Sequence, residues 1–230
     1  MVAQSSADSS RSQTLDRGLR ALNLIATSPT PLTIDEVAEQ LDLGRSVTYR
    51  MIRTLEDHRL VVRDAAGRLT GGTQLVVLAG RVSAEMKAIA APILTDLANT
   101  LQMTSFLVVP EDQEAVTVQV AEPTSTAAHV AYRPGTRHPL DRGAPGIALL
   151  AGLDPKPNER AEVTTARNSG WAYSEGEVIK GMASIAAPIT TNDGTTKAAV
   201  AVVHLALSLN SHDVAPLVVS AANTLGLKLS

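Results

Sequence analysis

Cysteine is absent from this chain of 230 residues, and aromatic side chains are scarce, with one Phe, one Trp and three Tyr. The lack of cysteine excludes disulfides, thiolate metal ligands and cysteine nucleophiles. The hydrophobic core must therefore be built from Ala, Val, Leu and Ile. The five histidines show no metal-ligand spacing, so we expect neither a metal ion nor a cofactor.

Long apolar runs are also missing. None reaches the roughly 18 residues of a membrane span. The polar, Ser-rich residues 1–12 lack the hydrophobic segment of a secretory signal. We interpret 1–12 as a disordered tail and expect a cytoplasmic protein with no membrane partner.

Basic residues do not dominate the composition. Lys and Arg number 20 and Asp and Glu 23, which gives a formal net charge of −3, and 44% of the residues are hydrophobic. This balance is typical of a soluble globular protein with one or two domains. If the chain binds nucleic acid, its basic side chains must be concentrated on one small face.

Helical periodicity opens the first folded region, which we assign to 13–72. Apolar residues recur at helical spacing over 13–27. Thr33 and Glu36 match a capping box, in which a hydroxyl and a carboxylate satisfy the free amides at a helix start. A Leu-Gly turn then leads into a third helix, predicted over 45–58.

Two short strands are predicted after the third helix, at 60–63 and 68–70, around a turn at 64–67. A plain three-helix bundle would share the three helices but would lack the hairpin. The order of elements therefore predicts a winged helix-turn-helix.

The third predicted helix has two distinct faces. Thr48, Met51, Ile52 and Leu55 are spaced to face the core, which turns five polar residues outward: Arg45, Ser46, Tyr49, Arg50 and Arg53. The second helix of a helix-turn-helix enters the major groove of DNA, where guanidinium groups can pair with guanine or phosphate. Arg63 and Arg68 flank the hairpin and could contact the DNA backbone. The alternative is a solvated helix face, because Arg favours helix on any surface.

Beyond the hairpin we expect a linker helix over 73–89 and a second domain over 90–230. Strand candidates occupy the middle of that domain, at 106–109, 115–120, 129–132, 184–189 and 198–207. Helix candidates lie at 92–101, 147–151, 159–168 and 214–227, and Asn192-Asp193-Gly194 predicts a hairpin turn. The pattern indicates an α+β fold with a largely antiparallel sheet.

The chain resembles the IclR family of bacterial transcriptional regulators. The resemblance rests on segments taken in order: 13–22, 33–41, 43–56, 135–151 and 170–189. It implies a GAF-like effector-binding domain, a homodimer or homotetramer, and small organic acids that change the affinity for DNA.

The resemblance also implies an effector pocket, which in this chain departs from the family pattern. The matching positions are Arg142, Ala144, Pro145, Gly146, Ser174, Ser184, Ala201 and Val203, and we add Trp171 and Tyr173 because they alternate on one predicted strand with Ala172. Two consecutive amides that hold the effector carboxylate match Ala144 and Pro145, and proline has no N–H. We therefore expect a more apolar pocket and a larger effector, such as an aromatic acid. Arg142 could hold a carboxylate or brace its loop, and Trp171 and Tyr173 could line the pocket or pack in the core.

No catalytic arrangement stands out. Residues 143–146 lack the Lys-Ser/Thr of a phosphate-binding loop, no Gly-x-Ser-x-Gly elbow is present, and nothing orients Asp141 beside His138 or Glu175 beside Glu177. We expect a ligand-responsive transcriptional repressor that binds double-stranded operator DNA and is not an enzyme. The alternative is a small-molecule-binding protein whose winged helix makes protein contacts, supported by the net charge and by Val47.

Overall fold

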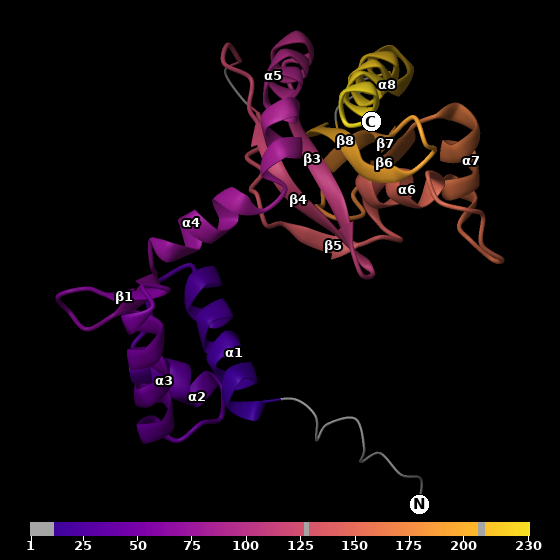
Figure 1. The fold of residues 1–230 in the computed structure, drawn as a ribbon. Coiled ribbons are helices and arrows are strands. Elements are labelled where there is room, and N and C mark those ends of the chain that lie inside the picture. Colours follow the sequence, from indigo (N-terminus) through magenta and orange to yellow (C-terminus); the bar gives the residue numbers. More distant parts are fainter. Residues whose placement is uncertain (1–11, 127–128, 207–209) are drawn as a thin grey trace, which may run out of the picture. The chain divides into compact units, whose positions relative to one another are not determined.

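A computed structural model describes residues 12–126, 129–206 and 210–230 of the chain (Figure 1). The chain forms two compact units, the first ending at Val82 and the second beginning at Ser83. Of the tail predicted over 1–12, only Ser12 lies within the described residues, and its hydroxyl accepts a hydrogen bond from the Leu15 amide at the start of the first helix.

The first unit contains the predicted helices. They are α1 (Gln13–Thr27), α2 (Ile34–Gln40) and α3 (Arg45–Asp57). The capping box is confirmed, because the Thr33 amide donates to the Glu36 carboxylate at 2.6 Å and the Glu36 amide donates to the Thr33 hydroxyl at 3.2 Å. A small aliphatic core lies between the helices and the hairpin: Ala21, Leu22, Ile25, Leu32, Val37, Ile52, Leu55, Val61 and Leu69.

The wing is an antiparallel hairpin of β1 (Val61–Arg63) and β2 (Leu69–Gly71). The Asp64 carboxylate accepts hydrogen bonds from the amides of Ala66 and Arg68, and Gly67 adopts the positive φ that the turn requires. An isolated bridge between Leu32 and Leu69 ties the hairpin to the segment that precedes α2. The winged helix-turn-helix is thereby confirmed.

The helix predicted over 73–89 is interrupted, which corrects the sequence analysis. The structure has α4 (Gln74–Arg81), then Val82 in an extended conformation and Ser83 in the left-handed region, then α5 (Ala84–Leu101). Gly80 weakens the helix just before the break. Pro92, expected near a helix start, lies inside α5.

The second unit is built on a six-stranded antiparallel sheet in the order β5-β4-β3-β8-β7-β6. The strands are β3 (Thr104–Glu111), β4 (Glu114–Ala121), β5 (Arg137–Pro139), β6 (Ala172–Glu175), β7 (Met182–Thr190) and β8 (Thr196–Leu205). α5 and α8 (Ser211–Lys228) cover one face, and α6 (Gly143–Ala151) and α7 (Ala161–Ser169) lie on the other (Figure 1). Each face of the sheet has its own buried core, so the predicted α+β class is confirmed.

Some local expectations in this unit differ from the structure. The segment predicted as a strand at 129–132 is irregular, and its Val130 carbonyl accepts a hydrogen bond from the Thr104 hydroxyl. The strand predicted over 198–207 begins earlier and ends at Leu205, and residue 207 lies outside the described residues. The predicted hairpin turn is confirmed, with Asp193 accepting from Thr191 and Thr195 and Gly194 at positive φ.

Helix length and apolarity bear on the membrane question. Within the described ranges, no helix is long and apolar enough to cross a bilayer.

Candidate nucleic-acid interface and effector cavity

The outward face of α3 follows from what its inward face buries. Thr48, Met51, Ile52 and Leu55 are buried, as their spacing predicts. The five residues predicted to face outward are all exposed: Arg45, Ser46, Tyr49, Arg50 and Arg53. The first four line one surface hollow, so the helix presents two arginines and two hydroxyls together.

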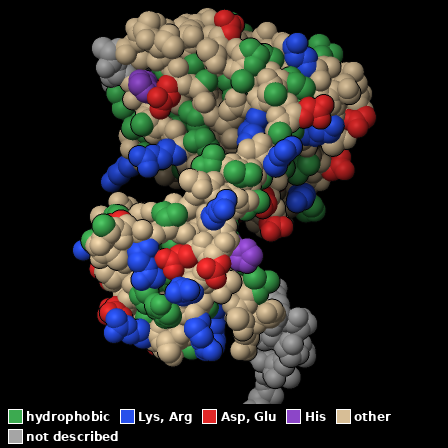
Figure 2. All heavy atoms as spheres, turned by 60° about the vertical axis from the view of Figure 1, so that its left-hand side comes forward, with side chains coloured by type: hydrophobic (Ala, Val, Ile, Leu, Met, Phe, Trp, Pro, Cys, Tyr) green, Lys and Arg blue, Asp and Glu red, His purple; other side chains and the backbone are tan. Residues whose placement is uncertain are grey.

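Arginine is the only cation in the described part of the first unit. Residues 12–82 contain nine Arg and no Lys against eight Asp and Glu. Figure 2 shows arginine side chains interspersed with carboxylates on one face of this unit. Guanidinium groups suit base-edge and phosphate recognition because their planar donors bind acceptors in pairs.

The predicted arginines differ in their partners. Arg63 binds both carboxylate oxygens of Glu56 on α3, at 3.0 and 3.3 Å, and Arg68 donates to the Pro31 carbonyl at 3.1 Å. Arg45 forms an exposed ion pair with Asp35 at 2.9 Å. The wing arginines therefore brace their own domain, and any DNA contact by them competes with these bonds.

The centre of the α3 face is less constrained by internal bonds. A side-chain hydrogen bond with Tyr49 raises the pKa of Arg53. Arg50 has no side-chain partner among the residues that the structure describes. Its guanidinium can therefore bind a ligand without breaking an internal bond.

The second unit encloses a cavity at the start of α6, bounded by β3, β7, β8 and the segment between β6 and β7. Its volume is only about 30 Å³, room for about one water molecule. The lining residues are Phe106, Tyr132, His138, Pro145, Ser174, Gly176, Glu177, Val178, Ile179, Met182, Ala183, Ser184 and Val203.

Aromatic and apolar groups form most of the wall. The rings of Phe106 and Tyr132 stack with their centroids 4.5 Å apart, and burial raises the pKa of Tyr132. His138 is buried, with Nδ1 3.0 Å from the Pro139 carbonyl oxygen, and its Nε2 has no partner among the described residues. If Nδ1 carries the proton, Nε2 offers an unused hydrogen-bond acceptor.

Two hydroxyls supply further polar atoms. The Ser174 hydroxyl accepts from the Ala144 amide at 2.7 Å, and it shares a hydrogen bond with the Ser184 hydroxyl at 3.0 Å. A spare hydroxyl proton of this pair could bind a ligand acceptor.

The cavity unites only some of the predicted effector residues. Pro145, Ser174, Ser184 and Val203 line it, whereas Ala144 is buried beside it with its amide donating to the Ser174 hydroxyl. Ala201 is packed in the core on the same side of the sheet. Gly146 lies so close to the segment that precedes α6 that a Cβ there would be 2.4 Å from the Leu140 carbonyl oxygen.

Three predicted residues lie elsewhere. Trp171 packs with the core under α5 and α8 and makes an edge contact with His212, at 5.4 Å between ring centroids. Tyr173 is 40% exposed and donates to Glu175 at 2.8 Å. Arg142 is exposed at the N-cap of α6 without a side-chain capping bond.

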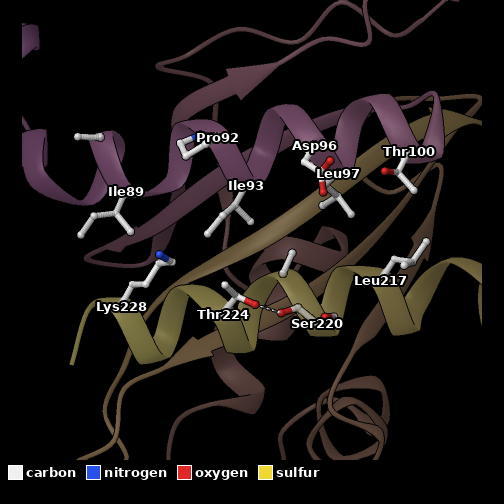
Figure 3. A pocket seen from close by; sticks show the side chains of 12 residues that line it. Ile89, Pro92, Ile93, Asp96, Leu97, Thr100, Leu217, Ser220, Thr224 and Lys228 are labelled. Carbon is white, nitrogen blue, oxygen red and sulfur yellow. Dashed lines mark hydrogen bonds between the residues drawn. The ribbon is translucent and has the colours of Figure 1, made fainter.

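Phe106, Tyr132, His138 and the segment 176–181 also contribute to the cavity wall and are not among the residues predicted from the sequence. Two glycines, Gly176 and Gly181, bracket that segment and are the feature of the sequence that marks it. A second, larger hollow of about 690 Å³ lies between α5 and α8 (Figure 3), with Asp96 and Thr100 toward one end and Lys228 at the other.

The described residues contain no group of three or more His, Asp or Glu that could hold a metal ion.

Two family models match the chain. A model described as the IclR helix-turn-helix domain covers residues 14–65, and one described as the bacterial transcriptional regulator IclR C-terminal covers 158–230. An HTH-type transcriptional regulator of Mycobacterium tuberculosis is 30% identical over 198 residues, which are 76% of this chain and 76% of that protein. The uncharacterised HTH-type transcriptional regulator RhmR of Escherichia coli is 26% identical and covers 88% of this chain and 86% of its own length.

Solved structures share the fold. An IclR transcriptional regulator from Alicyclobacillus acidocaldarius has a TM-score of 0.80 at 22% identity, covering 94% of this chain and 98% of that one. An IclR homologue from Microbacterium hydrocarbonoxydans, complexed with 4-hydroxybenzoate, has a TM-score of 0.81 at 20% identity, covering 95% and 100%.

Proposed function

The chain belongs to the IclR family of bacterial transcriptional regulators, and on that premise we propose that it is a repressor whose α3 reads operator DNA under the control of a small organic effector. The family consists of DNA-binding regulators rather than enzymes. The exposed face of α3 carries the proposal for this chain, because its polar side chains are turned out by four buried neighbours.

Each proposed DNA contact follows from its place in the winged helix-turn-helix. Arg45 and Ser46 occupy the first turn of α3, the part of a recognition helix that meets base edges. Tyr49, Arg50 and Arg53 follow on the same face and can reach bases or phosphates. Arg63 and Arg68 contact the backbone from the wing if they release their internal partners. Since bacterial operators lie in the cytoplasm, we place the protein there.

Exposed apolar side chains support a homodimer. On α1, Leu15 and Leu19 stand one turn apart and are 61% and 50% exposed. On α4, Val76, Val77 and Leu78 are all more than half exposed. A second copy would bury such surface, and two reading helices suit an operator with two half-sites.

The hollow between α5 and α8 is our candidate for a second contact, which would make a homotetramer. Asp96 and Lys228 lie toward opposite ends of it (Figure 3), and neither has a partner among the described residues. A two-fold axis through the hollow would bring each charge toward its opposite in the other copy. Sedimentation tests this: Lys228→Glu should reduce a tetramer to dimers, and Asp96→Lys added to it should restore the tetramer.

The effector is proposed to be a small organic acid with an aromatic ring. The stacked rings of Phe106 and Tyr132 and the apolar residues Val178, Ile179 and Met182 offer a wall that favours a ring. A protein of the same fold was crystallised with 4-hydroxybenzoate. Because the cavity offers only about 30 Å³, an effector of this size requires that the wall moves outward.

The test is fluorescence anisotropy with DNA from the promoter next to the protein's own gene. We expect tight, salt-dependent binding that weakens with 4-hydroxybenzoate or a related acid. Binding no tighter than to unrelated DNA, by a folded protein, would contradict the proposal and favour a winged helix that contacts protein. Reporter transcription that falls when the protein is deleted would indicate an activator.

A further inference from the structure

The N-terminus of α6 has no free hydrogen-bond donor in its first turn. The Gly143 amide donates to Glu177 Oε2 at 2.8 Å, the Ala144 amide donates to the Ser174 hydroxyl at 2.7 Å, and Pro145 has no N–H. Free amides and the helix dipole make such an end attractive to anions. Here the anion already present is the side chain of Glu177.

Glu177 is held by the groups that would recognise a free carboxylate. Arg160 donates from Nη2 to Oε1 at 2.9 Å and from Nη1 to Oε2 at 3.2 Å, so its guanidinium binds both oxygens. These bonds, followed by that from Gly143, keep the pKa of Glu177 below its usual value. A paired guanidinium and a backbone amide are a strong, planar carboxylate site.

The segment that carries Glu177 also closes the cavity. Gly176 and Gly181 bracket it, both with positive φ, a conformation that glycine adopts without strain. Val178 and Ile179 line the cavity between them. The segment packs tightly on α6, since a Cβ on Gly143 would lie 2.7 Å from Val178 Cγ2.

A second, independent feature points to a polar group as an occupant of this cavity. His138 lines it, is 5% exposed, and leaves its buried Nε2 without a partner among the described residues. A buried polar atom without a hydrogen bond is costly. A ligand hydroxyl or amine would satisfy it.

We propose that Glu177 is an internal substitute for the effector's carboxylate, and that residues 176–181 are a lid that exchanges Glu177 for an organic acid on Arg160 and the Gly143 amide. This inference rests on the proposed effector function of the same cavity. The cavity can enlarge if the lid moves away from α6, and that movement withdraws Glu177. Opening the space and freeing the carboxylate site are therefore one event.

The proposed site should select its ligands by charge as well as by size. An uncharged amide of the same shape cannot replace Glu177 on the guanidinium with equal strength, because its hydrogen bonds are not charge-assisted. Removal of the Glu177 carboxylate should strengthen binding of acids and leave binding of amides unchanged. Arg160 becomes a ligand-binding residue, the role that the sequence suggests for Arg142.

The experiment is calorimetric titration of the full chain with acetate, benzoate and 1-naphthoate, each paired with its amide. We expect Glu177→Ala to bind at least one acid roughly tenfold more tightly than the unmodified protein, the scale of one charge-assisted hydrogen bond. The control is Glu175→Ala, two residues away, whose side chain bonds only to Tyr173 in the described structure; it should change nothing. Arg160→Lys, added to Glu177→Ala, should remove the gain.

Glu177→Gln and thermal melting guard against a folding defect. If Glu177→Ala melts early, Glu177→Gln should still show a smaller gain for acids. The proposal is overturned by equal gains for acids and amides, by weaker acid binding in Glu177→Ala, or by no saturable binding of any acid to any of these proteins. Operator binding without ligand is measured in parallel. A protein that binds acids but not DNA would contradict the proposed function rather than the proposal about Glu177.

Discussion

The α3 face and the proposed effector cavity place their residues in opposite environments. The α3 face draws Arg45, Ser46, Tyr49 and Arg50 from one helix, and all are exposed. The cavity draws on residues from Phe106 to Val203, and many are buried in the core of the second unit. Substitutions on α3 should therefore change affinity alone, whereas substitutions in the cavity should also change stability.

The largest effect is expected from Phe106→Ala. Phe106 is fully buried, stacks on Tyr132 and is the only Phe of the chain. Truncation of a buried Phe costs roughly 3–5 kcal/mol of unfolding free energy. Urea unfolding followed by the fluorescence of Trp171, the only Trp, measures this loss of unfolding free energy in the second unit, which contains both residues.

The matched control is Tyr49→Ala on α3, an aromatic side chain that is 45% exposed. It should leave the Trp171 transition within about 0.5 kcal/mol of the unmodified protein. Similar losses in both variants would remove the contrast between the two sites.

The two sites were not equally predictable from the sequence. The helical bounds of α1, the Thr33 capping box and the two faces of α3 depend on residues within one or two turns of each other, so periodicity reveals them. The break at Ser83 depends on one residue in the left-handed region, which no periodic pattern indicates.

The cavity depends on which face of a strand each residue takes. Along β6, Ala172 and Ser174 face α6, so the alternation turns Trp171 and Tyr173 away. The order of strands and the closure of 176–181 over α6 bring Glu177 to Gly143, 34 positions apart. Long-range contacts of this kind leave no local pattern, and a family resemblance transfers positions without their side-chain directions.

A sharper test of the α3 face is Arg50→Ala. It should weaken operator binding by ~1–3 kcal/mol if the guanidinium pairs with a base, and the melting temperature should not change because the side chain is exposed and unpartnered within the described structure. Anisotropy at several salt concentrations measures the loss. Arg20→Ala, an exposed arginine on α1, is the control, and an equal loss there would point to general charge rather than to α3.

A smaller effect is expected from Thr33→Ala, which removes the capping box before α2. The cost should be about 1 kcal/mol, the usual value of an N-cap, and it should fall on the first unit. Hydrogen exchange of the α2 amides should accelerate, while the Trp171 transition of the second unit stays in place. Thr30→Ala, three residues earlier and outside the cap, should leave exchange unchanged. Faster exchange throughout the second unit would show that the cap has a wider role.

The smallest predicted effect is a difference between the two units in how much stability each loses in acid. Among the described carboxyls, the pKa is lowered at Glu159, Glu162, Glu177 and Asp193 in the second unit and only at Glu36 in the first. Arg167 is the main cause at Glu159, where the pKa falls from 4.5 to about 2. A folded-state pKa below the unfolded one gives stability that is complete above the unfolded value and is lost as pH falls toward the folded value. The melting temperature followed by Trp171 fluorescence should therefore drop between about pH 4.5 and pH 2, and it should drop less steeply in Glu159→Gln.

The control is Glu85→Gln, because Glu85 is an exposed carboxyl on α5 without an arginine partner in the described structure. This variant should keep the pH dependence of the unmodified protein. Equal slopes in all three proteins would contradict this assignment.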